Sequence, residues 1–209
     1  MENNSAVPVL FCIPDLTGFT KFITSTENTA FSQKVISNLL NKLIASNILG
    51  MSVAEIEGDA IFFYKRGRLP AIGNVAKQCK IIFETFNSVI NSFQKSDAEN
   101  YNKYLANNQL GIKIIIHFGH INITKIKGRT KLMGEDVILA HKLLKNSVSI
   151  ANYILLTDQY LEKLKDKKVV KNWFDWEKLK RGRDKYEHFG LTQYSYISLV
   201  DCENLNKNK

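Results

Sequence analysis

The stretch VPVLFCIPDLTGFTKFI, residues 7–23, determines how the rest of the chain is interpreted. Its first part, residues 7–13, is an apolar run of the kind that forms a buried strand. The run ends at Asp-Leu-Thr-Gly, residues 15–18, and apolar residues with helical spacing follow over 19–23. The stretch therefore predicts a strand, a tight turn and a helix.

The remaining sequence alternates between helical and strand patterns. Apolar residues at helical spacing predict helices over about 30–47, 71–93 and 135–146. Runs rich in Val, Ile and aromatic residues predict strands over 51–56, 60–64, 110–118, 121–126 and 153–157. Hairpin turns are predicted at 57–59 and near Gly119, a loop or insertion over the polar stretch 94–109, and late strands within 173–200.

This order of elements predicts an α+β fold, a ferredoxin-like βαββαβ core with additional strands whose sheet is covered by helices on one face. In such a core the first and third strands are neighbours in the sheet. No internal repeat or linker marks a boundary. We therefore expect a single domain over 1–209, with a core at about 7–157 and a C-terminal extension over 158–209.

Composition excludes several classes of protein. The chain has 209 residues, and 44% hydrophobic with 23% charged residues is incompatible with a disordered chain. No run approaches the roughly 18 apolar residues of a membrane helix, and the N-terminal apolar run is followed at once by Pro14 and Asp15, which argues against a signal peptide. Cys12, Cys79 and Cys202 lack metal-ligand spacing and fit reduced thiols. These features predict a cytoplasmic protein without a membrane partner.

The formal net charge of +9 raises the alternative of a nucleic-acid partner. Only five of the 29 basic residues are Arg, the better ligand for phosphate, and the abundance of Lys, Asn and Ile favours a compositional bias. Segment 163–185 mixes basic residues with Trp173, Phe174 and Trp176 and could bind a single strand by stacking, although core aromatic residues beside a solvated lysine face explain it better. We therefore do not expect nucleic acid as the partner.

Two carboxylates carry the chemistry. Asp15 lies at the carboxyl end of the first predicted strand, and Asp59 lies at the turn into the third. Because these strands are neighbours in a βαββαβ sheet, both side chains can converge at one edge, beside a Gly-containing turn that opens a helix. Such an arrangement suits a hard divalent cation and a triphosphate. Taken singly, each residue is also a common capping or turn aspartate.

Four ordered motifs resemble those of the class III adenylate and guanylate cyclase catalytic domain. They are FCIPDLTGFT at 11–20, EIEGDA at 55–60, GIKIIIHFG at 111–119 and GEDVILAHKL at 134–143. The resemblance implies cyclisation of a nucleoside triphosphate, in which the ribose 3′-hydroxyl attacks the α-phosphate and pyrophosphate leaves. It also implies sites formed between two subunits of a head-to-tail homodimer.

The resemblance assigns roles to individual residues. Asp15 and Asp59 would hold Mg²⁺ or Mn²⁺, and Glu55 would recognise the base. The triphosphate would be contacted by the backbone of the turn, at Leu16, Thr17, Gly18 and Phe19.

The sequence departs from the cyclase pattern on the last helix. Ile138 replaces an Asn that orients the ribose, and Lys142 replaces an Arg that stabilises the transition state. The usual partner of the base-recognising residue falls near Lys131, where neither Asp nor Cys is present. Runs 54–60 and 137–146 resemble an uncharacterised bacterial branch of cyclase-like domains, which implies a possible different chemistry.

Other residues of that helix are candidate substitutes for the lost pair, with His141 and Lys142 as the catalytic candidates and Lys145 and Asn146 beside them. For His141 and Lys145 the alternative is an exposed helix surface. His117 and His120 are three apart without a third ligand, which argues against a metal site there. Two hypotheses stay open, a divergent nucleotidyl cyclase and a catalytically inactive nucleotide-sensing or dimerisation module.

Overall fold

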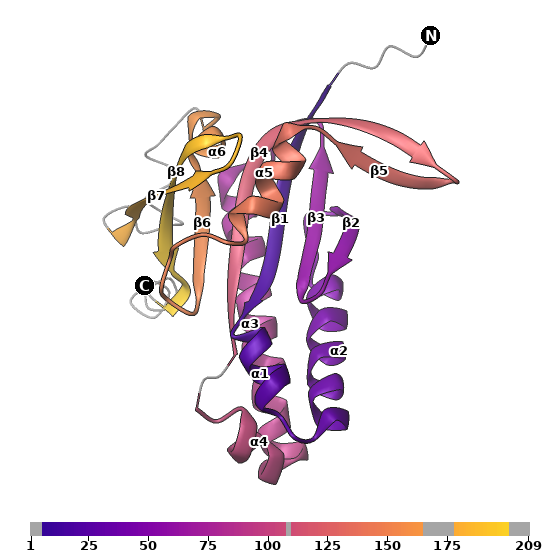
Figure 1. The fold of residues 1–209 in the computed structure, drawn as a ribbon, viewed down its shortest axis with the longest axis vertical. Coiled ribbons are helices and arrows are strands. Elements are labelled where there is room, and N and C mark those ends of the chain that lie inside the picture. Colours follow the sequence, from indigo (N-terminus) through magenta and orange to yellow (C-terminus); the bar gives the residue numbers. More distant parts are fainter. Residues whose placement is uncertain (1–5, 108–109, 165–177, 201–209) are drawn as a thin grey trace.

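The computed structural model of this chain describes residues 6–107, 110–164 and 178–200 (Figure 1). The strands are β1 (Val7–Thr17), β2 (Ser52–Glu57), β3 (Ala60–Arg66), β4 (Gly111–Ile126), β5 (Arg129–Met133), β6 (Tyr153–Thr157), β7 (Lys180–Tyr186) and β8 (Gly190–Ser198). The helices are α1 (Phe19–Ser25), α2 (Thr29–Ala45), α3 (Ile72–Ser96), α4 (Ala98–Tyr104), α5 (Glu135–Leu143) and α6 (Asp158–Glu162). Within the described ranges, none of the helices has the length and apolarity needed to cross a bilayer.

The sheet has the strand order β2-β3-β1-β4-β6-β8-β7, and β5 pairs with the distal part of β4. Its first four strands have the order of a ferredoxin-like core, with β1 between β3 and β4. Strands β6, β8 and β7 extend this core on one side, and β4 and β6 form a parallel pair. The predicted α+β fold with additional strands is therefore confirmed.

Helices cover both faces of the sheet, so the prediction of helices on one face was wrong. Alternate residues of β1 enter two separate cores, because successive side chains of a strand point to opposite faces. Leu10 and Cys12 pack with α2 and α3, whereas Val9 and Phe11 pack with α5. In Figure 1, α5 accordingly lies in front of the sheet and α3 behind it. Helix α5 is short and partly polar, which hid its role as a covering element.

Strand β4 is one continuous strand of 16 residues, so the predicted turn near Gly119 was wrong. The hairpin partner is β5, and the chain turns at Lys127 and Gly128, both of which have positive φ. Gly119 serves a close approach, because a Cβ there would lie 2.4 Å or less from the side chain of Asp136. The glycine therefore admits the first turn of α5 to the surface of β4.

The polar stretch 94–109 is not only a loop. Helix α3 runs on to Ser96, and α4 follows at once over Ala98–Tyr104. The Asp97 side chain accepts a hydrogen bond from the backbone N–H of Asn100, which caps α4. Tyr104 is buried against the α2–α3 core, and this aromatic contact stabilises a helix that the surrounding polar residues concealed.

Strand β1 continues through Asp15 to Thr17, beyond the end that the apolar run predicted. Its pairing with β3 is recorded from Val9 to Cys12, whereas its pairing with β4 continues to Thr17. Pro14 follows the last β3 pair, and a proline has no N–H to donate to a neighbouring strand. The two strands therefore part at Pro14, and the carboxyl end of β1 faces open space on that side.

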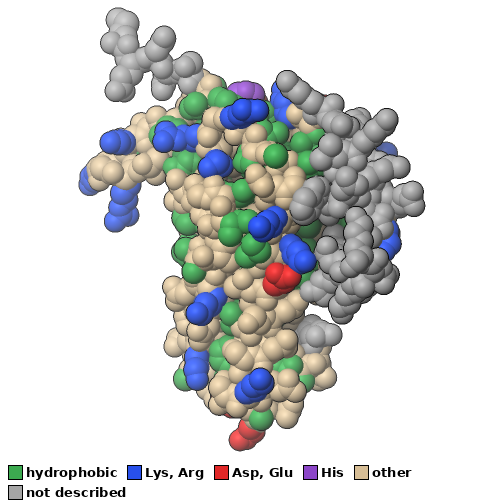
Figure 2. Space-filling view, turned by 180° about the vertical axis from the view of Figure 1, so that it is seen from behind, with side chains coloured by type: hydrophobic (Ala, Val, Ile, Leu, Met, Phe, Trp, Pro, Cys, Tyr) green, Lys and Arg blue, Asp and Glu red, His purple; other side chains and the backbone are tan. Residues whose placement is uncertain are grey.

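Cys12 and Cys79 are buried in the same core, while Cys202 lies outside the described residues. Trp173, Phe174 and Trp176 of the basic segment are also outside that part of the chain. On the face shown in Figure 2, lysine and arginine side chains are spread along the whole molecule.

Candidate functional site

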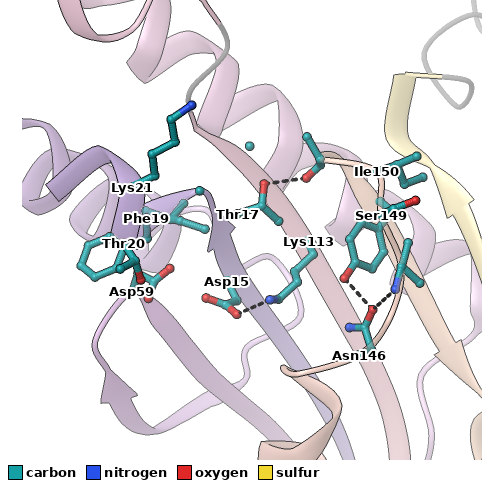
Figure 3. A pocket seen from close by; sticks show the side chains of 16 residues that line it. Asp15, Thr17, Phe19, Thr20, Lys21, Asp59, Lys113, Asn146, Ser149 and Ile150 are labelled. Atoms are coloured by element: carbon teal, nitrogen blue, oxygen red, sulfur yellow. Dashed lines mark hydrogen bonds and ion pairs between the residues drawn. The ribbon is translucent and has the colours of Figure 1, made fainter. Parts of the chain in front are cut away.

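A cavity of about 540 Å³ lies at the carboxyl end of β1, where β1 and β3 have parted. One wall is the turn from β1 into α1, and the opposite wall is the segment from Asn146 to Ala151 that follows α5. Asp59 at the β2–β3 turn and Lys113 at the start of β4 also line the cavity (Figure 3). The cavity is therefore built from segments far apart in the sequence.

Asp15 and Asp59 both line this cavity, as the predicted neighbourhood of β1 and β3 requires. Asp15 is buried and Asp59 is partly buried. Burial, and then the negative charge of Asp15, raise the pKa of Asp59 to about 7. A carboxyl group with such a pKa experiences an excess of negative charge in a poorly solvated place, which is a condition that a cation would relieve.

Lys113 is a residue of the site that the sequence reasoning missed. It is the register partner of Asp15 on β4, and its Nζ lies 2.9 Å from Asp15 Oδ2. The same Nζ donates a hydrogen bond of 2.8 Å to the backbone oxygen of Leu144. The signal was present, because Lys113 interrupts a run of isoleucines on a strand that is buried on both faces, and a buried charge needs a partner.

The turn predicted to contact a triphosphate, residues 16–19, also lines the cavity. Gly18 has a φ of 77°, a left-handed conformation that favours glycine, and its oxygen accepts the first hydrogen bond of α1. The Leu16 side chain belongs to the α2–α3 core, and the Thr17 hydroxyl donates to the oxygen of Ala151 at 2.8 Å. The side chains of Leu16 and Thr17 are therefore engaged within the chain, so a ligand at this turn would have to contact backbone groups.

A second polar cluster lies on the α5 side of the sheet and contains the predicted base-recognising Glu55. His141 Nε2 lies 3.2 Å from Glu55 Oε1, and His141 Nδ1 lies 2.8 Å from Glu57 Oε2. The ring of His141 stacks on Phe62 at 4.1 Å between centroids. Lys131 Nζ is 3.5 Å from the other oxygen of Glu55. We call Glu55, Glu57, Lys131 and His141 the β2–α5 cluster; no residue of it lines the cavity.

The candidates on and after α5 fall into two groups. Ile138 is 51% exposed and Lys142 is partly buried, and neither lines the cavity. Lys145 is exposed, as the alternative of a helix surface predicted. Asn146 does line the cavity, where its side-chain oxygen accepts hydrogen bonds from the Tyr153 hydroxyl at 2.9 Å and from Val148 N–H at 3.0 Å. Of the four candidate substitutes His141, Lys142, Lys145 and Asn146, only Asn146 lines the same cavity as Asp15 and Asp59.

His117 and His120 take structural positions. His117 is fully buried, with Nδ1 at 3.0 Å from Thr157 Oγ1 and Nε2 at 3.3 Å from Asp136 Oδ1. Asp136 also accepts a bond from the backbone N–H of His120 at 2.6 Å. Burial by itself would raise the pKa of Asp136, but the hydrogen bonds from His117 and His120 hold it below its usual range. This network fixes the start of α5 on β4.

Among the described residues, no group of three or more His, Cys, Asp or Glu side chains could hold a metal ion. A metal at Asp15 and Asp59 would therefore need further oxygen ligands from a substrate or from water.

Comparisons with known proteins agree with this architecture. A guanylyl cyclase, Cya2, superposes with a TM-score of 0.59 at 15% identity over 93% of both chains. A class III adenylyl cyclase-like ATP-binding protein from Pseudomonas aeruginosa gives a TM-score of 0.64 at 13% identity, covering 97% of this chain and 40% of that protein. At these identities the similarity establishes a cyclase-like fold.

Sequence comparison identifies the family. An uncharacterized protein of Mycobacterium tuberculosis is 33% identical over 116 residues, which are 52% of this chain and 51% of that protein, so the chain spans about half of that relative's length. Residues 36–153, more than half of the chain, match the model of a family described as "Protein of unknown function (DUF2652)". The chain therefore belongs to the DUF2652 family, and its fold is that of the class III nucleotidyl cyclases.

Proposed function

We propose that this chain binds a nucleoside triphosphate together with Mg²⁺ or Mn²⁺, as a divergent class III nucleotidyl cyclase-like domain that works as a homodimer. The observation that carries the proposal is the convergence of Asp15 and Asp59 on a cavity of about 540 Å³ beside the turn 16–19. The volume lies within the range of small-molecule sites.

The charge of the site fits a divalent cation. Two carboxylates line the cavity together with Lys113 and Lys21, and burial, followed by the negative charge of Asp15, raises the pKa of Asp59. Carboxylate oxygens are the ligands that Mg²⁺ and Mn²⁺ prefer, and Mg²⁺ commonly takes one or two of them plus substrate phosphates. Asp15 and Asp59 would hold the metal.

The chain's own groups would bind and orient the triphosphate around this pair. Backbone N–H groups of the turn 16–19 supply donors, and the Lys113 ammonium supplies a positive charge on the floor of the cavity. A bound divalent cation would neutralise charge on the phosphates and polarise the phosphorus under attack. The hydrogen bond from Thr17 to Ala151 links the two walls of the cavity.

Residues of β2 and α5 that lie away from the cavity explain why a dimer belongs to the proposal. Glu55, Lys142 and Ile138 occupy positions that face the nucleotide in the resembling family, yet none of them lines the cavity of its own chain. In a head-to-tail dimer these residues would complete the site of the other subunit. The exposed Met133 on β5 and Ile138 on α5 provide apolar surface for such an interface.

A second candidate, a nucleotide-sensing or dimerisation module without turnover, is favoured by the chemistry of α5. Ile138 has no hydrogen-bonding group for a ribose, and both ring nitrogens of His141 are already engaged by Glu55 and Glu57. Loss of one transition-state donor costs about 10²- to 10³-fold in rate. Binding can therefore persist where cyclisation does not.

One experiment separates the two candidates. Purified protein is incubated with ATP, GTP, CTP or UTP, each with Mg²⁺ and with Mn²⁺, and the products are identified by mass spectrometry beside the Asp15→Asn variant. Thermal melting is recorded for the same mixtures, because a ligand that binds only the folded state raises the melting temperature.

A cyclic nucleotide that disappears in Asp15→Asn establishes a cyclase and names its base. Stabilisation by a triphosphate and metal without product establishes the sensing module. Absence of both effects with all four nucleotides refutes the proposal. The variant Glu84→Gln, which removes an exposed carboxylate on α3, is the matched control and should behave as the wild type.

A further inference from the structure

Lys113 connects two parts of the molecule through one ammonium group. Its Nζ is 2.9 Å from Asp15 Oδ2 and 2.8 Å from the backbone oxygen of Leu144, and its side chain is only 15% exposed. Asp15 belongs to the cavity, whereas Leu144 is the C-cap residue of α5. The two acceptors therefore share one donor group in a place that water reaches poorly.

The oxygen of Leu144 is one of the carbonyl groups that a helix cannot satisfy from within. Lys113 satisfies it, and a positive charge at this end also suits the helix dipole. Other contacts also hold α5, with Asp136 bonded to β4 at its start and His141 bonded to β2 from its last turn. At the carboxyl-terminal end Leu143 is buried in the core and Asn146 Nδ2 donates to the oxygen of Leu143, and Lys113 adds the contact that joins this end to Asp15.

We propose that Lys113 is a positioning residue that transmits the state of Asp15 to the carboxyl-terminal end of α5. With Asp15 free and ionised, the ion pair holds the ammonium where it also caps Leu144. When Asp15 is engaged by a cation, the ammonium meets a like charge and loses its ion-pair partner. The cap on Leu144 then weakens, and the last turn of α5 opens more often.

Opening of this last turn would also change the cavity, because Asn146 follows directly after the turn and forms part of the cavity wall. It also affects α5, which carries the exposed Ile138 and the partly buried Lys142. In the proposed homodimer, and resting on that proposed function, occupancy of one subunit's carboxylates would loosen the helix that completes the other subunit's site. The coupling between Asp15 and α5 is a property of the free chain and can be measured without nucleotide.

The test is amide hydrogen exchange of the full chain, without metal or nucleotide, followed by mass spectrometry on peptides covering Leu143–Asn146. The proteins are wild type, Asp15→Asn, Lys113→Met, the double variant and Lys113→Arg. Lys103→Met is the matched control, because it removes another lysine that forms an ion pair, with Glu27, far from α5. Exchange of peptides from α3 reports whether each variant keeps its global fold.

We expect Asp15→Asn and Lys113→Met each to accelerate exchange at the end of α5 by about tenfold, the factor for one lost hydrogen bond to a charged group. In the double variant, Asp15→Asn should accelerate exchange no further, because the lysine that links Asp15 to Leu144 is already absent. Lys113→Arg should keep the exchange near that of the wild type, since a guanidinium can serve both acceptors. Lys103→Met should leave this peptide unchanged.

Two results would overturn the inference. One is unchanged exchange at 143–146 in Asp15→Asn while α3 stays protected; the other is an equal acceleration by Asp15→Asn with and without Lys113. If Lys113→Met fails to fold, Asp15→Asn and Lys113→Arg still decide, because the first must accelerate exchange and the second must not. Failure of nucleotide binding is read separately from the melting experiment, so it cannot be confused with failure of the coupling.

Discussion

Replacing Asp59 by asparagine should stabilise the chain at neutral and alkaline pH. The pKa of Asp59 rises from the ordinary 3.8 to about 7 through burial and the charge of Asp15. The folded state therefore binds the proton more tightly than the unfolded state does. Wild-type stability consequently falls as pH rises from about 4 to about 7, whereas an asparagine at this position carries no such penalty.

The magnitude follows from the same difference. A change of about three pH units corresponds to at most about 4 kcal/mol at 1.36 kcal/mol per unit. Because Asp59 is partly exposed and shares the effect with Asp15, we expect about 1–2 kcal/mol at pH 8. For a chain of this length that gain raises the melting temperature by about 2–8 °C. Below about pH 4, where both states carry a neutral side chain, the gain should vanish.

Urea unfolding of wild type and Asp59→Asn between pH 4 and pH 8, with Glu84→Gln as a control of equal charge change, measures this difference. Adding Mn²⁺ at pH 8 should stabilise the wild type and leave Asp59→Asn nearly unchanged. The reasoning is refuted if Asp59→Asn is no more stable than the wild type at pH 8. It is equally refuted if the difference between them does not depend on pH.

Two further substitutions test the packing that positions the site. Gly119→Ala places a Cβ within 2.4 Å of the Asp136 side chain and should destabilise the chain by about 2 kcal/mol or more, measured by urea unfolding, with Asp136→Ala restoring part of the loss. Gln78→Leu should cost about 3 kcal/mol in the same assay, because the fully buried Gln78 accepts from the backbone N–H groups of Ile48 and Leu49, and leucine would leave both without a partner; an unchanged unfolding midpoint would contradict this.

Local patterns were sufficient for much of the fold. The helix predicted over about 71–93, which the structure extends to Ser96, and the hairpin of β2 and β3 follow from apolar spacing and a Gly-Asp turn. Their order leads to the ferredoxin-like core. The placement of Asp15 and Asp59 at one cavity followed as well, because it depends only on β1 and β3 being neighbours.

The remaining features depend on contacts between residues far apart in the sequence. Glycine is typical of turns, but Gly119 is instead required because the Asp136 side chain packs against it. The neighbouring sequence does not distinguish a turn glycine from a glycine at such a close contact. His141 was predicted as a catalytic candidate, and its contacts with Glu55 and Glu57 require the packing of α5 against β2. Lys113 could have been found by asking which acid can neutralise a lysine in a buried strand, since Asp15 is its partner in the register.

The register of strand β4 sets the positions of groups at both of its ends. Its 16 residues extend about 50 Å, with Lys113 near one end and the hairpin to β5 at the other, where it reaches beyond the body of the sheet (Figure 1). One alignment of β4 with β1 sets both positions, from Val7 opposite Ile121 to Thr17 opposite Gly111. A slip of two residues would carry Lys113 about 7 Å from Asp15 and shift the tip of the hairpin by the same amount. The register that pairs Lys113 with Asp15 at the cavity thus also determines how far the β4–β5 hairpin projects at the opposite end of the strand.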